Sequence, residues 1–391
     1  MFGHRRLVRI PIVLAVSAAA VTAACSGSGT SSSNGASGAD ASSAASGQSS
    51  AAGSGPTLAA LAKAELALPQ LPSVAAPSGK SVWIVTCSLE ASGCAGQAGF
   101  IQSVMEKQLK WKATTFDGKL APATYQAGIT QALVAHTDAI VLVGIDCASV
   151  KPALQKAKAA KVPVVGAAGY DCTDPSQGGG QSLLTATDVG GSAAASFAAQ
   201  GRALADYMTA ETNGSGKAVV ATEPDFQVVV AELAGFKTEL AKVCPGCSVA
   251  AEAPALGADL ANGSAAAKLS STLLQQPSAT VVVALQDSQL SYVTNALRTS
   301  AKKVPVIASG GTAADVQLIK NGTIKGIMAQ DLNLQAWVTS DFVVRLLATT
   351  APVTVQPALT LVDKDHNLPS SGGFVTPVDY QSAYKKAWGV S

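Results

Sequence analysis

Histidine, the residue that most often serves as a catalytic base or metal ligand, is scarce in this sequence. Of 391 residues only three are histidine: His4 near the start, His136 late in a predicted helix and His366 in a C-terminal loop. The sequence also has no G-x-S-x-G motif, no phosphate-binding loop and no zinc-ligand spacing. An enzyme needs a nucleophile with its base, or a metal centre, gathered in one site. We therefore expect no catalytic activity, no metal and no cofactor.

An excess of basic charge is also absent once the first residues are set aside. The whole chain has 27 Lys and Arg against 25 Asp and Glu. Residues 1–24 contain Arg5, Arg6 and Arg9 and no acidic residue, so 24 basic residues remain against 25 acidic ones. The positive formal charge of the full chain thus comes from its N-terminal segment. Since the rest has no basic stripe, we expect no nucleic-acid partner.

The N-terminal apolar run is too short to span a bilayer. Ile10–Ala20 follows a basic segment, which is the arrangement of a secretory signal peptide. It leads into Thr22-Ala23-Ala24-Cys25, which resembles the lipobox of bacterial lipoproteins. We predict a lipoprotein signal peptide over 1–24 and a lipidated Cys25 that anchors the protein at the extracytoplasmic face of the cell membrane. The alternative is an ordinary cleaved signal with an incidental cysteine.

Residues 26–55 offer almost no side chains that could build a core. They are nearly all Ser, Gly and Ala, a composition that stays flexible. A coil of about 30 residues, at roughly 5–6 Å times the square root of their number, spans about 30 Å. We predict a lipidated cysteine with a flexible linker over 25–55, then a proline-containing stalk over 56–79.

The globular part, residues 80–391, is long for one hydrophobic core and suits two lobes. Its periodicity predicts two successive series of alternating strands and helices. The first series has predicted strands at Ser81–Thr86, Trp111–Phe116, Ala139–Gly144, Val162–Val165 and Leu183–Thr187, and helices at Gly99–Lys110, Thr124–His136, Val150–Lys161 and Gly191–Thr209. The second has strands at Lys217–Thr222, Ser248–Glu252, Thr280–Leu285, Val304–Ala308 and Gly326–Gln330, and helices at Val228–Val243, Ser264–Gln275, Asp287–Thr299, Thr312–Asn321 and Gln335–Thr349. Alternation of this kind predicts an α/β fold of two similar lobes, each a parallel sheet flanked by helices.

Acidic side chains follow two strands of the first series. Asp146-Cys147 comes after one and Asp171-Cys172 after the other. In an open α/β sheet, ligands bind beyond the carboxyl ends of the strands. We therefore expect these carboxylates near a binding cleft. The alternative is that both aspartates cap helices or turns and both cysteines form a scaffold bridge.

Six cysteines remain after Cys25, an even number in an exported chain. Cys147 and Cys172 follow strands that should be neighbours, so they can pair. Cys87 and Cys94 bracket a short loop. Cys244-Pro-Gly-Cys247 could be redox-active or half of a zinc site, but Pro-Gly is turn chemistry. We predict three disulfides, Cys87–Cys94, Cys147–Cys172 and Cys244–Cys247.

Several short stretches, taken in order, resemble one known family. They are Phe116-Asp-Gly118 with the Tyr125-Gln126 helix, the Ala139–Val165 core, Gly235-Phe236-Lys237, Leu285-Gln-Asp-Ser288, Gly311-Thr312 and Ala329-Gln330-Asp331. Together they resemble the type I periplasmic substrate-binding proteins of ABC importers, in the ribose-binding-like branch. The resemblance covers about Lys80 to Thr349. The cysteine pattern and alanine-rich composition are similar to those of an actinobacterial branch of such lipoproteins.

The resemblance implies a ligand cleft between two lobes that three crossing segments join. By alignment the crossings fall near Thr185–Asp188, Gly310–Thr312 and Gln330–Leu332. The first lobe would contain about 80–186 plus 312–329. The second would contain about 188–309 plus 332–391.

The motifs that hold sugars in this family are altered here. Cys87-Ser88-Leu89-Glu90 replaces Asn-Pro-aromatic after the first strand, Val230 replaces a helix arginine, and Gly310 replaces a hinge aspartate. Other residues must then contact the ligand. The candidate ligand-binding residues are Asp117, Asp146, Tyr170, Asp171, Asp225, Phe226, Gln286, Asp287, Gly310, Gln330, Asp331 and Trp337. The carboxylates would accept hydroxyl or amine protons and the aromatic rings would stack on the ligand; ordinary core packing is the alternative for each ring.

The function that the resemblance implies is solute capture. The protein would be a membrane-anchored, monomeric solute-binding protein that takes a small polar ligand, a sugar or sugar-like molecule, to the permease of an ABC importer. Ligand binding would close the two lobes. The alternative is a ligand-sensing lipoprotein that passes a signal to a membrane receptor.

Overall fold

The structure, a computed structural model, describes residues 55–391 apart from 64–65, 190–191, 301 and 357. These residues fall within one compact unit of the chain. The predicted signal peptide, the lipidated Cys25 and the linker up to residue 54 lie outside the described residues. None of the helices that the structure describes is long and apolar enough to cross a membrane.

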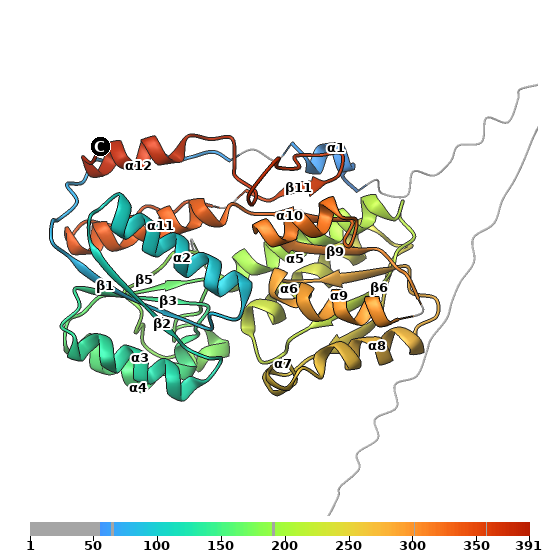
Figure 1. The fold of residues 1–391 in the computed structure, drawn as a ribbon, viewed down its shortest axis with the longest axis horizontal. Coiled ribbons are helices and arrows are strands. Elements are labelled where there is room, and N and C mark those ends of the chain that lie inside the picture. The colour runs from blue at the N-terminus through green and yellow to red at the C-terminus, as the bar shows by residue number, and fades with distance from the viewer. Residues whose placement is uncertain (1–54, 64–65, 190–191, 301, 357) are drawn as a thin grey trace, which may run out of the picture. The chain divides into compact units, whose positions relative to one another are not determined.

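The first lobe is built on a five-stranded parallel sheet that lies between two layers of helices (Figure 1). The strand order is β2-β1-β3-β4-β5. Its strands are β1 (Ser81–Thr86), β2 (Lys112–Asp117), β3 (Ala139–Val143), β4 (Val164–Ala167) and β5 (Ala186–Thr187). In the centre, Val82 of β1 lies opposite Ala113 of β2 and Ala139 of β3. The inner strands β3 and β4 are apolar and fully buried, because helices cover both faces of a parallel sheet.

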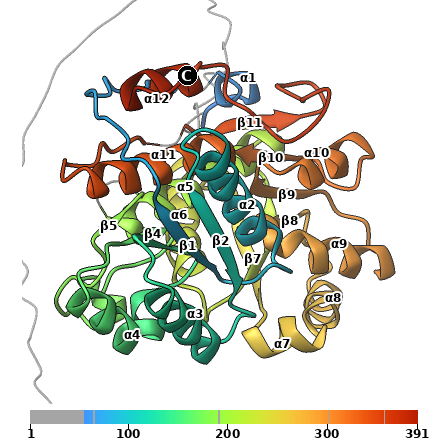
Figure 2. The ribbon, with the colours of Figure 1, turned by 60° about the vertical axis from the view of Figure 1, so that its left-hand side comes forward.

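Alternate strand residues of this sheet pack against two different helix layers. The helices are α2 (Ser92–Lys107), α3 (Pro122–Val134), α4 (Cys147–Ala159), α11 (Leu332–Leu347) and α12 (Tyr380–Trp388). Ile84 packs with α2 and α11, whereas the next residue, Val85, packs with α3 and α4. Both are fully buried, and each such side chain contributes about 1.5–3 kcal/mol. The α12 helix packs outside α11 (Figure 2).

The second lobe contains a six-stranded sheet in the order β11-β10-β9-β8-β6-β7, in which β11 is antiparallel to β10. Its strands are β6 (Lys217–Thr222), β7 (Ser248–Pro254), β8 (Val281–Ala284), β9 (Val306–Gly310), β10 (Gly326–Ala329) and β11 (Thr360–Asp363). The helices α5 (Ala193–Glu211) and α6 (Gln227–Val243) cover one face. The other face is covered by α8 (Ala265–Gln275), α9 (Leu290–Thr299) and α10 (Ala313–Lys320).

Two glycines allow α5 and α6 to approach closely. A Cβ atom on Gly201 would lie 1.9 Å from the carbonyl oxygen of Glu232, and one on Gly235 would lie 2.0 Å from that of Ala198. These atoms belong to the backbone and cannot move aside without separating the helices. Gly235 is the glycine of the Gly-Phe-Lys motif, so this motif has a packing role here.

Two segments lie in the other lobe from the one that was predicted. Residues 312–329 lie in the second lobe, because Ala329 of β10 pairs with Gly310 of β9. The α11 helix lies in the first lobe, where it packs against α2. The stretch Gly310–Thr312 is therefore not a crossing, since β9 and α10 both belong to the second lobe.

The chain passes between the lobes at other points as well. The segments that join β5 to α5 and β10 to α11 were expected to cross. Two further crossings join α11 to β11 and β11 to α12. Neither β11 nor α12 was predicted, nor was the short helix α7 (Gly257–Asn262). All the strands and helices that were predicted are present, with ends displaced by a few residues. The largest displacement is at the start of α2, which begins at Ser92 rather than Gly99.

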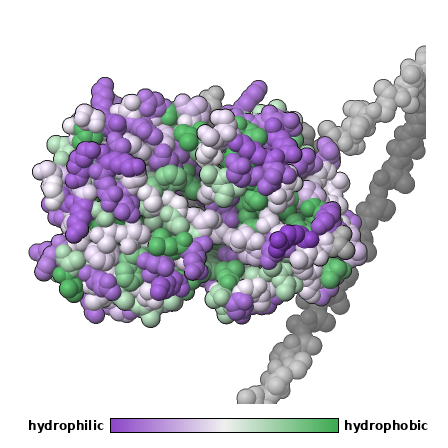
Figure 3. All heavy atoms as spheres, in the orientation of Figure 1, coloured by the Kyte–Doolittle hydropathy of each residue, from purple (hydrophilic) through white to green (hydrophobic). Residues whose placement is uncertain are grey.

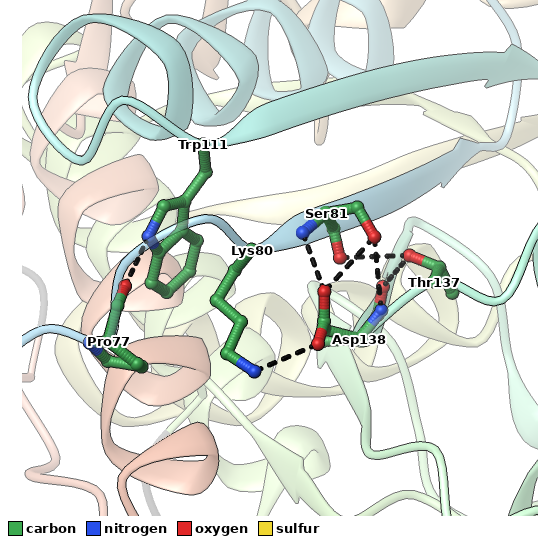
Figure 4. Close-up of polar contacts among 7 residues, drawn as sticks. Pro77, Lys80, Ser81, Trp111, Thr137 and Asp138 are labelled. Carbon is green, nitrogen blue, oxygen red and sulfur yellow. Dashed lines mark hydrogen bonds and ion pairs between the residues drawn. The ribbon is translucent and has the colours of Figure 1, made fainter.

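The predicted stalk is part of the fold over the stretch that precedes β1. Val74 donates its N–H to the carbonyl oxygen of Ala387 at 2.7 Å. Figure 4 shows the indole N–H of Trp111 donating to the carbonyl oxygen of Pro77 at 2.7 Å. Lys80 then pairs with Asp138 at 3.0 Å, where β1 begins. Upstream, α1 (Leu58–Leu61) packs against the second lobe.

The six cysteines of the described chain form the three predicted disulfides. The Cα atoms are 5.9 Å apart in Cys87–Cys94, 5.2 Å in Cys147–Cys172 and 5.3 Å in Cys244–Cys247. Cys147 begins α4, and Cys172 lies in the loop after β4, so this bridge ties together the ends of two neighbouring strands. On the face shown in Figure 3, hydrophilic and hydrophobic residues are interspersed.

Candidate functional site

A cavity of about 860 Å³ lies between the two lobes and is lined by residues of both. Its first-lobe wall follows from the parallel sheet, because the carboxyl ends of β1, β2 and β3 meet at one edge. Ser88, Asp117 and Asp146 come from these ends, and Gln97 comes from α2. Asp117 accepts hydrogen bonds from the N–H groups of Leu89 and Lys119, both at 3.0 Å.

The second-lobe wall is built by the same rule. Glu223 follows β6, Gln286 and Asp287 follow β8, and Gly310 ends β9. Gln200 reaches the cavity from α5. The carboxyl ends of the parallel strands of both sheets therefore face the same cavity.

The crossing segments contribute a third group of polar side chains. Asp188, next to β5, accepts hydrogen bonds from the Thr339 hydroxyl at 2.5 Å and from the Ala168 N–H at 3.2 Å. Gln330, after β10, accepts one from the side-chain amide of Gln335 at 2.6 Å. Asp188, Gln330 and Gln335 all line the cavity, so a ligand there can contact the segments about which the lobes would move.

Three buried amide or carboxyl atoms of the cavity wall have no hydrogen-bond partner among the described residues. They are Nε2 of Gln97, Oε1 of Gln200 and Oδ2 of Asp287. The three side chains are only 5%, 5% and 8% exposed. Buried polar groups in native proteins are nearly always paired. Unpartnered groups around one cavity therefore indicate a polar ligand.

Burial raises the pKa of the cavity carboxyls. The pKa of Asp146 is raised to about 6 by burial, which outweighs the hydrogen bond from the Tyr170 N–H; Asp174 adds to the rise. Burial likewise raises the pKa of Asp188 to about 6 and that of Glu223 to about 7. A ligand that brought hydrogen-bond donors or positive charge would lower these pKa values again.

Asp287 is a buried carboxyl that lies close to both walls of the cavity. Burial, followed by the neighbouring charge of Asp315, raises its pKa to about 7. A Cβ atom on Gly93, at the start of α2, would lie 2.9 Å from its Oδ1. Asp287 of the second lobe thus lies against the first lobe, at the point where the two walls meet.

Gln286 is held by a buried acid. Its amide nitrogen donates a hydrogen bond to the carboxyl of Glu232 in α6. Glu232 is fully buried, and burial raises its pKa well above the ordinary value. A protonated Glu232 would hold Gln286 in place as part of the wall without adding charge.

Seven of the twelve predicted ligand-binding residues line the cavity, and they stay predicted ligand contacts. They are Asp117, Asp146, Phe226, Gln286, Asp287, Gly310 and Gln330. The other five lie elsewhere: Tyr170, Asp171, Asp225, Asp331 and Trp337.

Three of those five are aspartates that hold the backbone. Asp171 accepts hydrogen bonds from the N–H groups of Leu183 and Leu184, both at 3.0 Å. Burial alone would raise the pKa of Asp171, but such hydrogen bonds outweigh it and the pKa is lowered. Asp331 caps α11, and the exposed Asp225 accepts from the N–H of Gly257 at 2.8 Å. For Asp171 the turn-capping alternative was therefore correct.

The remaining two are aromatic residues that pack in the core. Trp337 is buried in the first lobe and stacks on Trp388 with ring centroids 5.3 Å apart. Tyr170 stacks on Phe197 of α5 at 5.9 Å and donates its hydroxyl to the carbonyl oxygen of Gln227 at 3.3 Å. Tyr170 therefore joins the two lobes beside the cavity, although it does not line it.

The polar cavity residues that sequence reasoning missed include Gln97, Asp188, Gln200, Glu223 and Gln335. Glu223 directly follows a predicted strand, so the rule that selected Asp146 could have found it. Asp188 lies at the end of a predicted crossing. The three glutamines lie within helices, where the sequence does not show which helix face meets the cavity.

Comparisons with known proteins agree with this architecture. Residues 99–351 match the family described as periplasmic binding protein domain. The solved structure of the Caulobacter myo-inositol binding protein bound to myo-inositol is similar to this chain at 19% identity and a TM-score of 0.61, covering 75% of this chain and 96% of that one. No curated protein sequence matches the chain significantly.

Two further solved structures share the fold. The solute binding protein of an ABC transporter from Burkholderia graminis C4D1M, in complex with D-arabinose, matches at 20% identity and a TM-score of 0.60, covering 75% of this chain and 98% of that one. The binding protein of the arabinose ABC transporter from Shewanella sp. ANA-3, bound to L-arabinofuranose, matches at 13% identity and a TM-score of 0.58. The match covers 73% of this chain and 92% of that one. The family match spans more than half of the chain and the two parallel-sheet lobes confirm the predicted fold, so the chain belongs to the periplasmic binding protein family and has the type I fold.

Proposed function

We propose that this protein is an extracytoplasmic solute-binding protein that captures a small polyhydroxylated molecule, a sugar or a cyclitol, in the cavity between its lobes. It then presents the ligand to the permease of an ABC importer. The similar structures named above hold myo-inositol, D-arabinose and L-arabinofuranose. The family consists of binding proteins, so the protein binds its ligand without transforming it.

The observation that carries this proposal is the set of unpartnered polar atoms in the cavity wall. Gln97 offers a donor, whereas Gln200 and Asp287 offer acceptors. A hydroxyl group both donates and accepts, so a polyol can satisfy all three at once. Each group left unpaired costs about 1–3 kcal/mol, and a bound polyol removes that cost.

The cavity also has apolar walls suited to the carbon skeleton of a sugar. Phe197 and Phe226 line it beside the polar groups. Aromatic rings pack against the apolar face of a sugar while the hydroxyl groups meet polar atoms at the edge. The volume of about 860 Å³ falls within the range of about 300–1,000 Å³ that is usual for small-molecule sites.

Both lobes supply ligand contacts, which suggests how binding changes the protein. A ligand that touches Gln97 of the first lobe and Asp287 of the second binds the closed form better than an open one. That difference in affinity shifts the population towards the closed form. The Tyr170 contacts with Phe197 and Gln227 join the lobes outside the cavity and would break on opening.

The first experiment is a thermal-shift screen over pentoses, hexoses and cyclitols at millimolar concentration. A ligand that binds only the folded protein raises its melting temperature. Small-angle scattering should then show a smaller radius of gyration with the ligand than without it. If no sugar or cyclitol raises the melting temperature, the proposed function is wrong.

A matched pair of variants tests the site. Gln200→Leu removes an unpartnered acceptor from the wall, and Gln131→Leu makes the same change at an exposed position of α3. Gln200→Leu should weaken binding by about 1–3 kcal/mol, whereas Gln131→Leu should leave the dissociation constant unchanged. Equal affinities in both variants would place the ligand elsewhere.

Anchoring and delivery complete the proposal. Cys25 would carry the lipid and residues 25–55 would let a monomeric binding domain reach its permease. The same cavity could instead serve a lipoprotein that reports the ligand to a membrane receptor. Uptake of radiolabelled ligand by cells, lost when the protein is deleted, distinguishes import from sensing.

A further inference from the structure

The cavity wall carries far more negative than positive charge. Seven acidic residues line it: Glu90, Asp117, Asp146, Asp188, Glu223, Asp259 and Asp287. Among the described residues that line it, Lys119 is the sole cationic side chain, and it is exposed. Glu90 is exposed as well, so solvent can screen both of these charges. The buried part of the wall is acidic.

One of the buried acids is already neutralised. Asp259 forms an ion pair with Lys268 at 2.6 Å and also caps a short helix. The half-buried Asp117 and Asp146 and the buried Asp188, Glu223 and Asp287 make no ion pair with any described residue. Asp117, Asp146 and Asp188 at least accept hydrogen bonds from backbone N–H groups.

Within the described chain Asp287 keeps one carboxyl oxygen unpaired, although hydrogen bonds from the N–H groups of Asp287 and Ser288 partly offset the cost of its burial. Its side chain is 8% exposed, and its Oδ2 has no partner among the described residues. The titratable groups near it are Asp315 of α10 and Glu232 of α6, both acidic. The start of α2 faces it with Gly93, which has no side chain. A buried carboxylate among other acids is costly unless a cation pairs with it.

A metal ion does not account for this arrangement. No group of three or more His, Cys, Asp or Glu side chains within the described residues has the geometry to hold a metal ion. Asp287 instead lines a cavity large enough for an organic molecule, and neutral amides and aromatic rings also line that cavity. The missing positive charge can therefore come from the ligand itself.

We propose that the cavity selects a polyhydroxylated ligand that bears a protonated amine, an amino sugar or an aminocyclitol, and that Asp287 binds its ammonium group. This inference rests on the proposed function and narrows its ligand class. Asp287 lies at the junction of the two walls, so the ammonium group would draw the lobes together. Carboxylate and phosphate derivatives of sugars are rejected, because they would add negative charge to an acidic wall.

Isothermal titration calorimetry on the full-length protein at pH 7.5 tests the proposal with matched ligands. The pairs are D-glucosamine with D-glucose, D-galactosamine with D-galactose, and scyllo-inosamine with scyllo-inositol; D-glucuronate is the acidic probe. In at least one pair the amine should bind about 10- to 100-fold tighter than the alcohol, the range of a hydrogen bond to a charged group. D-Glucuronate should bind more weakly than D-glucose.

Asp287→Asn should reduce the ratio of amine to alcohol affinity to about one. Asp225→Asn is the matched control, because it makes the same change of charge at an exposed residue that does not line the cavity. It should keep the wild-type ratio. The comparison of paired ligands on the wild-type protein does not depend on either variant folding.

The outcomes separate this inference from the proposed function. If sugars or cyclitols bind and no amine binds more tightly than its alcohol, the amine inference is wrong and the proposed function stands. If the amine is preferred but Asp287→Asn keeps the full preference, Asp287 is not the ammonium site. If none of the sugars, cyclitols and their amines binds, the proposed function itself is wrong.

Discussion

Replacing Asp287 with asparagine should change how the stability of the ligand-free protein depends on pH. The substitution keeps the shape of the side chain and removes its charge. Burial and the neighbouring Asp315 raise the pKa of Asp287 from 3.8 to about 7. At about 1.4 kcal/mol per pH unit, this difference corresponds to about 4 kcal/mol as an upper value.

The sign follows from proton linkage. The folded protein holds the proton of Asp287 more strongly than the unfolded chain does. The free energy of unfolding therefore falls as the pH rises from about 4 to about 7. Asp287→Asn removes this loss, so the variant should gain stability over the wild type as the pH rises through this window.

Melting temperatures measured from pH 5 to pH 8 provide the assay. At about 2 °C per kcal/mol for a protein of this size, the variant should melt up to about 8 °C higher than the wild type at pH 8, with a smaller difference at pH 5. Raised carboxyls that do not interact with Asp287, such as Glu223, titrate in both proteins and cancel in the comparison. Asp315 and Glu232 interact with Asp287 and contribute to the difference. Parallel curves for wild type and Asp287→Asn would refute the reasoning, and Asp225→Asn should run parallel to the wild type.

Four other predictions follow from the sequence and the structure. Gln330→Ala should weaken ligand binding by about 1–3 kcal/mol, as measured by calorimetry; an unchanged dissociation constant would place the hinge outside the site. Gly235→Ala should lower the melting temperature by several degrees, because its Cβ atom would overlap the backbone of α5. Thiol titration of the unfolded, unreduced protein should find no free thiol, and peptide mapping should show the three local bridges rather than any other pairing. Cys25→Ala should release the protein from membranes; continued membrane association, without fatty-acid labelling of the wild type, would contradict lipid anchoring.

The choice of control residues also depends on the structure. Asp363 lies in the C-terminal region and looks remote from the site in the sequence. In the structure it is buried in β11 and accepts hydrogen bonds from the N–H groups of Asp365 and His366. Its replacement would disturb the sheet edge, whereas Asp225 is exposed.

The sequence alone was sufficient for the repeating α/β pattern and the local disulfides. Apolar strands such as Ala139–Val143 are short, buried on both sides and bounded by glycine or acidic residues, so their period and limits are visible in the sequence. Each disulfide joins cysteines at most 25 residues apart, which local spacing can predict. Acidic residues directly after strands, such as Asp146 and Asp287, were found for the same reason.

Only the tertiary structure decided which lobe each C-terminal segment joins. The β10 strand pairs with β9, and α11 packs on α2 from the other lobe. A parallel strand and an amphipathic helix fit either lobe equally well by pattern. For α11 the choice depends on contacts with α2, more than 200 positions away in the chain, which local periodicity does not contain.

The tertiary structure also decided which polar residues face the cavity. Asp171 and Asp331 follow strands as Asp146 does, yet their carboxylates turn to backbone N–H groups. Gln97 and Gln200 carry no sequence signal, because their role depends on how α2 and α5 are rotated against the sheets. The sequence by itself determined the elements and the sheet edge at which the cavity lies. The packing of those elements decided which side chains reach it, since burial and the choice of hydrogen-bond partners are set by neighbours distant in the chain.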